Sequence, residues 1–270
     1  MSAEVRGRGL HTGGLSSVRF ERCAGPVVVR AGGRDTRIED LRALESARST
    51  TVSLPDGSTI ATVEHVLAAL GGLGIHDGVA VTVEGGEMPL ADGGARAYAD
   101  ALVALDVPAS PPSLHVVRDG VIETGASRYE FVVNADPSAT TLEIRIDFGD
   151  VRIAESASWH GDPSDFIARI APARTFGFEH ELDDLLARGL ATHVTPESVV
   201  VFGEGRVLAS GRAYSADEPA RHKLLDLIGD LYLHGGPPRG DVRVVRPGHA
   251  ATHEVMHRAL AIGLVVRRGR

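Results

Sequence analysis

The order of apolar and polar residues divides the first part of the chain into short strands and two helices. Apolar residues that alternate with polar ones indicate strands, because successive side chains of a strand point to opposite faces. This pattern occurs at 17–20, 27–30 and 79–83. Apolar residues spaced three and four apart predict helices at 61–73 and 96–105.

The second part of the chain repeats this mixture on a larger scale. Strands are predicted at 114–117, 128–133, 141–147 and 242–245. Helices are predicted at 165–170, 181–188, 219–233 and 249–262. Strands and helices of this kind in both parts indicate an α+β protein. The stretch Gly203-Glu204-Gly205-Arg206 is typical of a hairpin turn.

A Pro/Ser-rich segment separates the two parts. Residues 103–112 read VALDVPASPP, and a strand pattern restarts at Leu114. Proline and serine in such density end a helix and form a connection. We therefore expect a domain boundary near Ser110–Ser113, with one domain over 1–111 and a second over 112–270.

The two parts resemble each other around one helix. The stretch 64–73 (EHVLAALGGL) parallels 221–230 (RHKLLDLIGD), and each is followed by a glycine-containing turn, a valine-rich strand and a further helix. A duplicated α+β unit would explain the match and would place His65 and His222 at equivalent positions. Two unrelated amphipathic helices could also match this well, so both interpretations stay open.

Composition narrows the partners. The 270 residues are 43% hydrophobic and 24% charged, as in ordinary globular proteins, and the net charge is −8. This charge argues against nucleic acid or an anionic membrane as partner, but leaves room for a local basic pocket. Cys23 is the single cysteine, and the start of the chain has no apolar signal-peptide core. We expect a cytoplasmic, monomeric protein without stable membrane insertion.

The helix predicted at 219–233 carries the clearest chemistry. His222, Asp226 and Asp230 recur every four residues and so share one face, with neighbouring side chains about 5–6 Å apart. An imidazole and a carboxylate one turn apart can bind the same metal ion. A second acid one turn further on can orient another catalytic group.

A second pattern, His253-Glu254-Val255-Met256-His257, matches the HExxH signature of zinc proteases. Such sites need a third protein ligand downstream, and residues 258–270 contain no His, Asp, Glu or Cys. We interpret the match as accidental and expect it on the solvent face of a helix.

A better metal site can be assembled from both halves. A catalytic zinc takes three protein ligands and leaves one position for water. His222 and Asp226 would supply two ligands, and His65 the third from the equivalent helix. Glu64 beside it could accept a proton from an activated water, and Asp230 could hold a further histidine in its tautomer. Each residue alone is more often solvated or capping; the joint pattern is less easily accidental.

Six motifs in order give the chain a specific resemblance. They are Gly9-Leu10-His11-Thr12-Gly13, Thr62-Val63-Glu64-His65, Ala91-Asp92-Gly93-Gly94-Ala95, Ala173-Arg174-Thr175-Phe176-Gly177-Phe178, the stretch from Arg221 to Asp230, and Gly248-His249-Ala250. Together they resemble the motifs of the UDP-3-O-acyl-N-acetylglucosamine deacetylase family, which acts in lipid A synthesis. The resemblance covers nearly the whole chain.

The resemblance implies an active site and a reaction. It implies that His65, His222 and Asp226 bind one zinc ion per chain, and that Glu64 is the general base. It further implies that His249 is the acid, oriented by Asp230, that Thr175 donates to the oxyanion, and that Lys223 binds substrate electrostatically. The reaction would be hydrolysis of the N-acetyl group of a UDP-linked acylated amino sugar. The implied fold has two α+β domains with helices layered between two sheets, and it places the HExxH match behind His249.

Several departures from the family pattern bear on substrate more than on chemistry. Only eight residues precede Gly9, so the N-terminal edge is expected to be shorter than usual. The GHA motif continues into Ala251-Thr252-His253 instead of an Asn pair. In place of a Gly-Gly-Ser stretch, the passage for the acyl chain has 191–198 (ATHVTPES). The side chains expected to line the passage and the substrate site are Phe176, Leu182, Val194, Val199 and Val201.

The sequence is therefore compatible with three functions. The first is a zinc-dependent deacetylase of the UDP-linked amino sugar. The second is the same zinc chemistry on another N-acylated substrate, motivated by the altered 191–198 segment. The third is a non-catalytic sugar-nucleotide binder, which would be expected to lack Glu64 or His249, although both are present.

Overall fold

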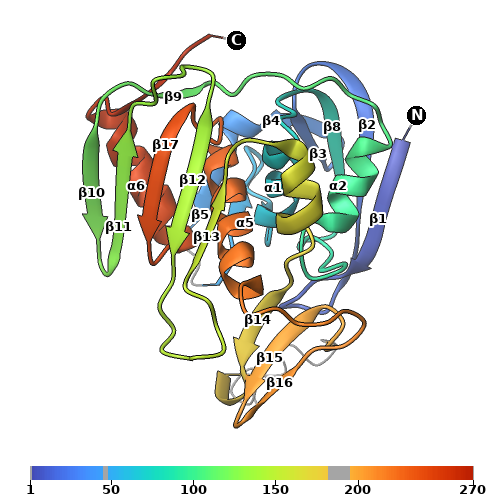
Figure 1. Cartoon of the computed structure of the whole chain (residues 1–270). Coiled ribbons are helices and arrows are strands. Elements are labelled where there is room, and N and C mark those ends of the chain that lie inside the picture. The colour runs from blue at the N-terminus through green and yellow to red at the C-terminus, as the bar shows by residue number, and fades with distance from the viewer. Residues whose placement is uncertain (1, 45–47, 182–194, 270) are drawn as a thin grey trace.

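Two five-stranded sheets enclose a layer of helices (Figure 1). This computed structural model describes residues 2–44, 48–181 and 195–269. The predicted α+β class, with helices layered between two sheets, is confirmed. Within those described ranges, no helix has both the length and the apolar character needed to cross a membrane.

The first sheet is built by the N-terminal part of the chain. Its strands are β1 (Ser2–Arg8), β2 (Leu15–Pro26), β3 (Val28–Ala31), β4 (Arg34–Arg37) and β8 (Asp77–Glu84). They lie in the order β1-β2-β8-β3-β4. Neighbouring strands are antiparallel except β3 and β8, which are parallel. Helices α1 (Glu64–Gly72) and α2 (Arg96–Val103) belong to this unit.

The second sheet comes from the C-terminal part. Its strands are β10 (Gly120–Thr124), β11 (Ser127–Val132), β12 (Thr140–Arg145), β13 (Ser156–Trp159) and β17 (Gly240–Val245). Their order is β10-β11-β17-β12-β13, with β12 and β17 parallel and the other neighbours antiparallel. Its helices are α5 (Glu218–Leu233) and α6 (His249–Ala261).

The two units have the same topology. In each, four strands are followed by the first helix, a strand inserted at the centre of the sheet, and the second helix. The single parallel pair occupies the same place in both sheets. The duplication is therefore real, and α1 and α5 are equivalent helices. Residues 104–113 join the units, and the domain limits 1–111 and 112–270 stay a prediction.

Each unit carries its own small insertion before its first helix. In the first unit, β5 (Arg42–Leu44), β6 (Thr51–Ser53) and β7 (Thr59–Ile60) form a three-stranded sheet. In the second, β14 (Thr175–Phe178), β15 (Val199–Gly203) and β16 (Arg206–Leu208) form another, which projects below α5 in Figure 1. The hairpin predicted at 203–206 joins β15 to β16. A two-stranded pairing of β9 (Leu114–Val116) with β18 (Val265–Arg267) completes the set.

The sheets bury one face each against the helices. In β2, Val18 and Phe20 are buried, and in β17 Val242 and Val244 are buried, while the residues between them are more exposed. This two-residue period is the signal that predicted these strands. The removal of these side chains from water is the main favourable term in folding.

Helices α1 and α5 approach each other closely at Gly229. A Cβ added there would lie 2.0 Å from the backbone oxygen of Glu64, closer than atoms can stand. Only a residue without a side chain allows this approach. The contact brings the start of α1, with Glu64 and His65, against the middle of α5.

Some predicted elements differ from the observed ones. At the N-terminal edge β1 pairs with β2 along seven residues, and an edge shorter than is usual in the family stays a prediction. The helix predicted at 165–170 is a short α-turn, Pro163–Asp165, continued by a wider π-helical turn, Phe166–Ile170. Of the helix predicted at 181–188, only Glu181 lies in the described residues.

Candidate metal centre and active site

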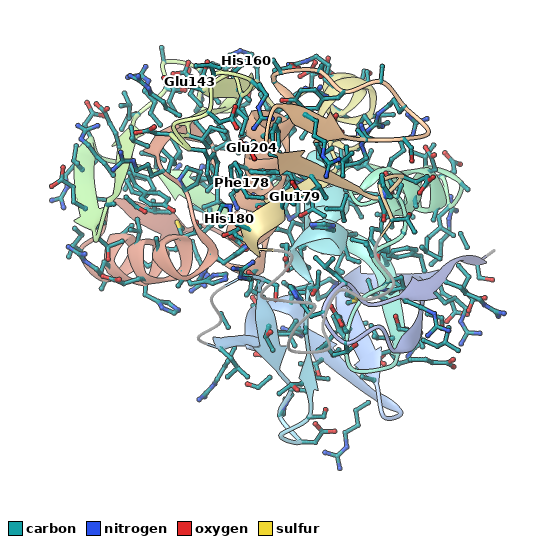
Figure 2. All side chains as sticks on the ribbon, turned by 90° about the horizontal axis from the view of Figure 1, so that it is seen from below. Glu143, His160, Phe178, Glu179, His180 and Glu204 are labelled. Atoms are coloured by element: carbon teal, nitrogen blue, oxygen red, sulfur yellow. The ribbon has the colours of Figure 1, made fainter. Side chains whose placement is uncertain are left out.

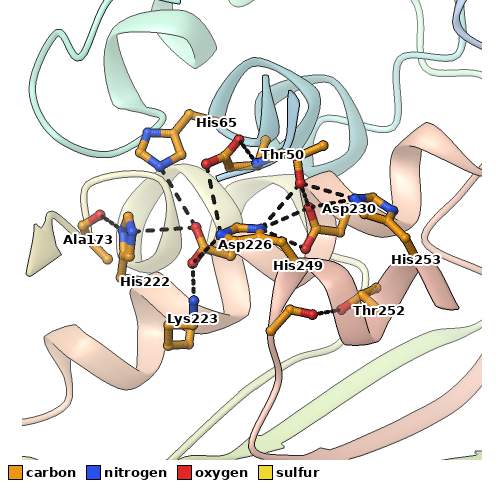
Figure 3. A network of polar contacts seen from close by, with 12 residues as sticks. Thr50, His65, Ala173, His222, Lys223, Asp226, Asp230, His249, Thr252 and His253 are labelled. Atoms are coloured by element: carbon orange, nitrogen blue, oxygen red, sulfur yellow. Dashed lines mark hydrogen bonds and ion pairs between the residues drawn. The ribbon is translucent and has the colours of Figure 1, made fainter. Parts of the chain in front are cut away.

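His65, His222 and Asp226 meet between α1 and α5 (Figure 3). One ligand atom from each residue lies within 4.8 Å of the others, and all three side chains are buried. The Nε2 atoms of His222 and His65 lie 3.4 and 3.8 Å from Oδ1 of Asp226. This group could hold a metal ion, as the spacing on α5 and the parallel between the two helices predicted.

Backbone carbonyls orient both imidazoles. Nδ1 of His222 donates to the carbonyl of Ala173 over 2.9 Å, and His65 is hydrogen-bonded to the backbone of Gly94. Burial lowers the pKa of His65 to about 3 and also lowers that of His222. Both rings are therefore neutral, the form that binds metals, and the bond to Ala173 leaves the lone pair of His222 at Nε2. Two imidazoles and a carboxylate are a donor set suited to zinc.

The carboxylate of Asp226 is shared with a lysine. Nζ of Lys223 donates to Oδ2 of Asp226 over 2.6 Å, leaving Oδ1 on the side of the two histidines. Burial alone would raise the pKa of Asp226, but Lys223 and His222 outweigh it and hold the pKa well below its usual range. Lys223, which was predicted as a substrate contact, therefore orients the carboxylate of Asp226.

Glu64 and His249 face each other beside the group formed by His65, His222 and Asp226. Nε2 of His249, the first residue of α6, lies 3.9 Å from Oε1 of Glu64. Burial raises the pKa of Glu64 to about 8, with His249 opposing it. Burial would lower the pKa of His249, but its contact with Asp230, over 2.9 Å from Nδ1 to Oδ2, contributes most to raising it to about 9. Two groups that can exchange protons, a carboxyl and an imidazole, therefore stand side by side.

Thr50 connects these two groups and was not predicted. Its backbone N–H donates to Oε2 of Glu64 over 2.9 Å, and its hydroxyl donates to Oδ1 of Asp230 over 2.5 Å. The side chain is almost fully buried. Thr50 belongs to the insertion of the first unit, 180 residues from Asp230, and nothing in its sequence surroundings marks it.

A buried ion pair supports residues 173–175, the loop whose Ala173 carbonyl accepts from His222. Arg174 donates from its backbone N–H, Nε and Nη2 to the carboxylate of Glu218, and both side chains are only 2% exposed. The guanidinium also donates to the carbonyls of Ser210 and Arg212. The pair therefore fixes the backbone at Arg174, directly after Ala173, whose carbonyl orients His222. Glu218 was not among the predicted site residues.

A second buried carboxylate, that of Glu87, holds the loop at residues 9–13, which is the first of the six motifs. It accepts from the backbone N–H groups of His11 and Thr12 and from the hydroxyl of Thr12. The hydroxyl of Thr62, whose φ of +59° lies in the left-handed region, donates to it as well. Burial would raise the pKa of Glu87, but these hydrogen bonds outweigh burial and lower it. The first two motifs are thus linked through one residue.

Two further predicted residues, Thr175 and Phe176, lie near this centre. Thr175 begins β14, two residues after Ala173, and the ring of Phe176 is 6.3 Å from that of His222. Val199 and Val201 form a small buried apolar cluster with Leu90. Leu182 and Val194 lie outside the described residues.

Aromatic rings continue outward from Phe176 on the underside of the molecule. Phe148 packs edge-on against Phe176, with ring centroids 5.2 Å apart, and Phe178 stacks with His180 at 5.8 Å. Figure 2 shows Phe178, Glu179 and His180 close together beside Glu204. An aromatic surface therefore leads away from the metal group.

The HExxH match at 253–257 lies on α6, behind His249. Glu254 and His257 are exposed, but His253 is buried, so the expected solvent face is wrong at this residue. Its ring is covered because α6 turns it towards Thr50 and His234. Periodicity did not reveal this because both neighbours come from distant segments.

Comparison with known proteins agrees with this geometry. The family model of the UDP-3-O-acyl N-acetylglycosamine deacetylases matches residues 1–261. The chain is 32% identical to the UDP-3-O-acyl-N-acetylglucosamine deacetylase of Myxococcus xanthus over 276 residues, covering 96% of this chain and 84% of the relative. It is 32% identical to the enzyme of the same name from Shewanella sp. strain W3-18-1 over 272 residues, 96% of this chain and 87% of the relative. A third relative of that name, from Syntrophotalea carbinolica, is 32% identical over 216 residues, 79% of this chain and 69% of its own.

Proposed function

The chain belongs to the UDP-3-O-acyl N-acetylglycosamine deacetylase family, and from this premise we propose that it hydrolyses the N-acetyl group of UDP-3-O-acyl-N-acetylglucosamine. The products are acetate and the free amine of the sugar, in the committed step of lipid A biosynthesis. The observation that carries this proposal is the convergence of His65, His222 and Asp226 beside Glu64 and His249. An amide is hydrolysed when water is activated, charge on the carbonyl oxygen is stabilised and the nitrogen receives a proton.

The proposed metal is one zinc ion per chain, held by His65, His222 and Asp226. The donor set supports this choice, because two neutral imidazoles and one carboxylate suit zinc and leave a position open. Bound there, zinc would supply Lewis acidity, which lowers the pKa of water and polarises a carbonyl. A cation at this place would also lower the pKa of Glu64, because positive charge favours the carboxylate.

Glu64 is proposed as the general base and His249 as the general acid. Glu64 is buried and hydrogen-bonded through one oxygen to Thr50, so its other oxygen, towards His249, can take the proton of water. His249 is held by Asp230 through Nδ1, which leaves the Nε2–H to protonate the departing amine. Asp230 thereby fixes the ring and favours its charged form.

Thr175, Lys223 and the apolar residues are proposed to act on the substrate. The hydroxyl of Thr175 would donate to the developing oxyanion, and the backbone that carries it is held by the Arg174–Glu218 pair. The ammonium of Lys223 would add positive charge for the anionic sugar nucleotide. Phe176 would contact substrate beside His222. Val199 and Val201, together with the predicted Leu182 and Val194, would bind the acyl chain. Monomeric state and cytoplasmic location stay predictions of the sequence.

The test is a deacetylation assay on the UDP sugar carrying 3-O-acyl chains of several lengths, with metal content measured on the same samples. We expect about one zinc per chain, and Glu64→Gln should keep the zinc while kcat falls by about 10²–10⁴, the usual scale for a general base. His65→Ala should lose both zinc and activity, whereas His257→Ala, on the exposed face of α6, is the matched control and should lose neither. No turnover at any acyl length by the zinc-loaded wild type would exclude this substrate.

A further inference from the structure

His253 is a buried histidine to which the mechanism above assigns no role. Its Nε2 lies 3.1 Å from the hydroxyl of Thr50, and its Nδ1 lies 3.0 Å from Nε2 of His234, the residue that follows α5. The groups facing this pair are Asp230, 3.7 Å from Nε2 of His253, with His249 behind it, and the ring of His257 against His234. Arg267 donates to the backbone carbonyl of His234. Both imidazoles are thus part of a continuous contact with the acid–base residues.

The protons of this chain of contacts can be assigned in only one order. The carboxylate of Asp230 only accepts, so the single proton of the Thr50 hydroxyl points to it. The hydroxyl oxygen must then accept from His253, which places the proton of His253 on Nε2. Nδ1 of a neutral His253 is therefore an acceptor, and His234 must donate to it from its own Nε2. Burial lowers the pKa of both rings, that of His234 to about 3, which agrees with two neutral imidazoles.

We propose that His253 and His234 are positioning residues for the catalytic dyad, acting as a one-way hydrogen-bond chain through Thr50 to Asp230. The chain holds Oδ1 of Asp230 against the hydroxyl of Thr50, while Nδ1 of His249 lies 2.9 Å from Oδ2 and 3.1 Å from Oδ1 of the same carboxylate. Each donor polarises the next, so the last bond, onto Asp230, is strengthened. Thr50 is also the residue that donates to Glu64, so the same chain steadies the base. The effect on turnover rests on the proposed deacetylase function; the proton order does not.

The kinetic test compares three variants of the full, zinc-loaded enzyme. His253→Leu removes the donor to Thr50, and we expect kcat to fall about three- to tenfold, the scale of one lost hydrogen bond, with KM unchanged. His234→Phe keeps the ring contact but removes the donor, and a fall of about threefold in kcat is expected. His253→Gln, whose amide can reach Thr50, should restore kcat to within about twofold of the wild type. A merely structural role would instead lower stability without this order and without rescue by Gln.

His257→Ala is the matched control, because His257 packs against the ring of His234 from the exposed side of α6 and contributes no hydrogen bond to the chain from His234 to Asp230. It should leave kcat and KM unchanged. If His253→Leu retains the wild-type kcat, or if His253→Gln is as impaired as His253→Leu at equal zinc content, the positioning role is wrong.

A measurement independent of activity tests the proton order itself. The ring nitrogens of the ¹⁵N-labelled protein at about pH 8 should report both His234 and His253 as neutral Nε2–H tautomers, with resonances assigned by their loss in the two variants. A proton found on Nδ1 of His253 would overturn the inference even if the enzyme is fully active. Conversely, an inactive wild type with both Nε2–H tautomers would contradict the proposed function and leave the chain intact.

Discussion

Substitution in the buried pair of Arg174 and Glu218 tests how the loop at residues 173–175 is held in place. Glu218→Leu removes a carboxylate that accepts from the backbone N–H, Nε and Nη2 of Arg174. The guanidinium would then be left 2% exposed without its counter-charge. Removing one partner of a buried pair costs about 3–5 kcal/mol, because the remaining charge is desolvated and unpaired. For a chain of this size, that lowers the melting temperature by about 6–20 °C.

The same change should weaken metal binding. Without Glu218, the backbone N–H of Arg174 loses its acceptor, so the neighbouring carbonyl of Ala173 should hold Nδ1 of His222 less firmly. Loss of such a supporting contact reduces metal affinity about 10–100-fold. Urea unfolding would measure the first effect and competition with a zinc chelator the second.

Two further variants isolate the cause. Arg174→Met combined with Glu218→Leu removes both charges, and should recover part of the lost stability without recovering zinc affinity. Asp100→Ala breaks an exposed pair with Arg96 and should cost only about 0.2–1 kcal/mol. If Glu218→Leu costs no more than Asp100→Ala, or if the double variant is less stable than Glu218→Leu alone, the reasoning from burial is refuted.

Two other predictions concern packing and pH. Gly229→Ala places a Cβ against the backbone oxygen of Glu64, and it should lower the free energy of unfolding in urea by about 1–3 kcal/mol and weaken zinc binding. Gly71→Ala, whose Cβ would meet side-chain atoms at 3.2 Å, should cost less, and equal losses would contradict the packing argument. Glu87→Gln should be less stable than the wild type at pH 7. Because folding lowers the pKa of Glu87 from 4.5, the extra free energy of unfolding of the wild type should be full above that pH and shrink as the pH falls below it. A difference between the two proteins that does not change with pH would refute this.

The local order of apolar and polar residues predicted many of the strands and helices of the fold. Strands such as β2 and β17 follow from alternating apolar residues, and α5 from its three- and four-residue period. The likeness between 64–73 and 221–230 suggested a duplication, but two unrelated amphipathic helices could also have matched in this way. The strand order decided between them, because two unrelated units would not share a central inserted strand and the same single parallel pair.

The three residues proposed to hold the metal were predictable for a similar reason. His222 and Asp226 share a helix face whatever that helix packs against, and His65 was found through the repeat and the family resemblance. The sequence did not indicate how closely α1 and α5 approach each other. That distance depends on Gly229, whose missing side chain lets the backbone of α1 come close.

What the sequence by itself determined is therefore periodic and local: the elements, the shared faces, and the residue types able to bind a metal and move protons. The tertiary structure alone decided which buried polar groups support them, as Thr50 does for Asp230, Glu218 for Arg174 and His234 for His253. The physical reason is that a buried donor must find an acceptor in space. A partner such as Asp230, 180 residues away, leaves no local trace in the pattern around Thr50.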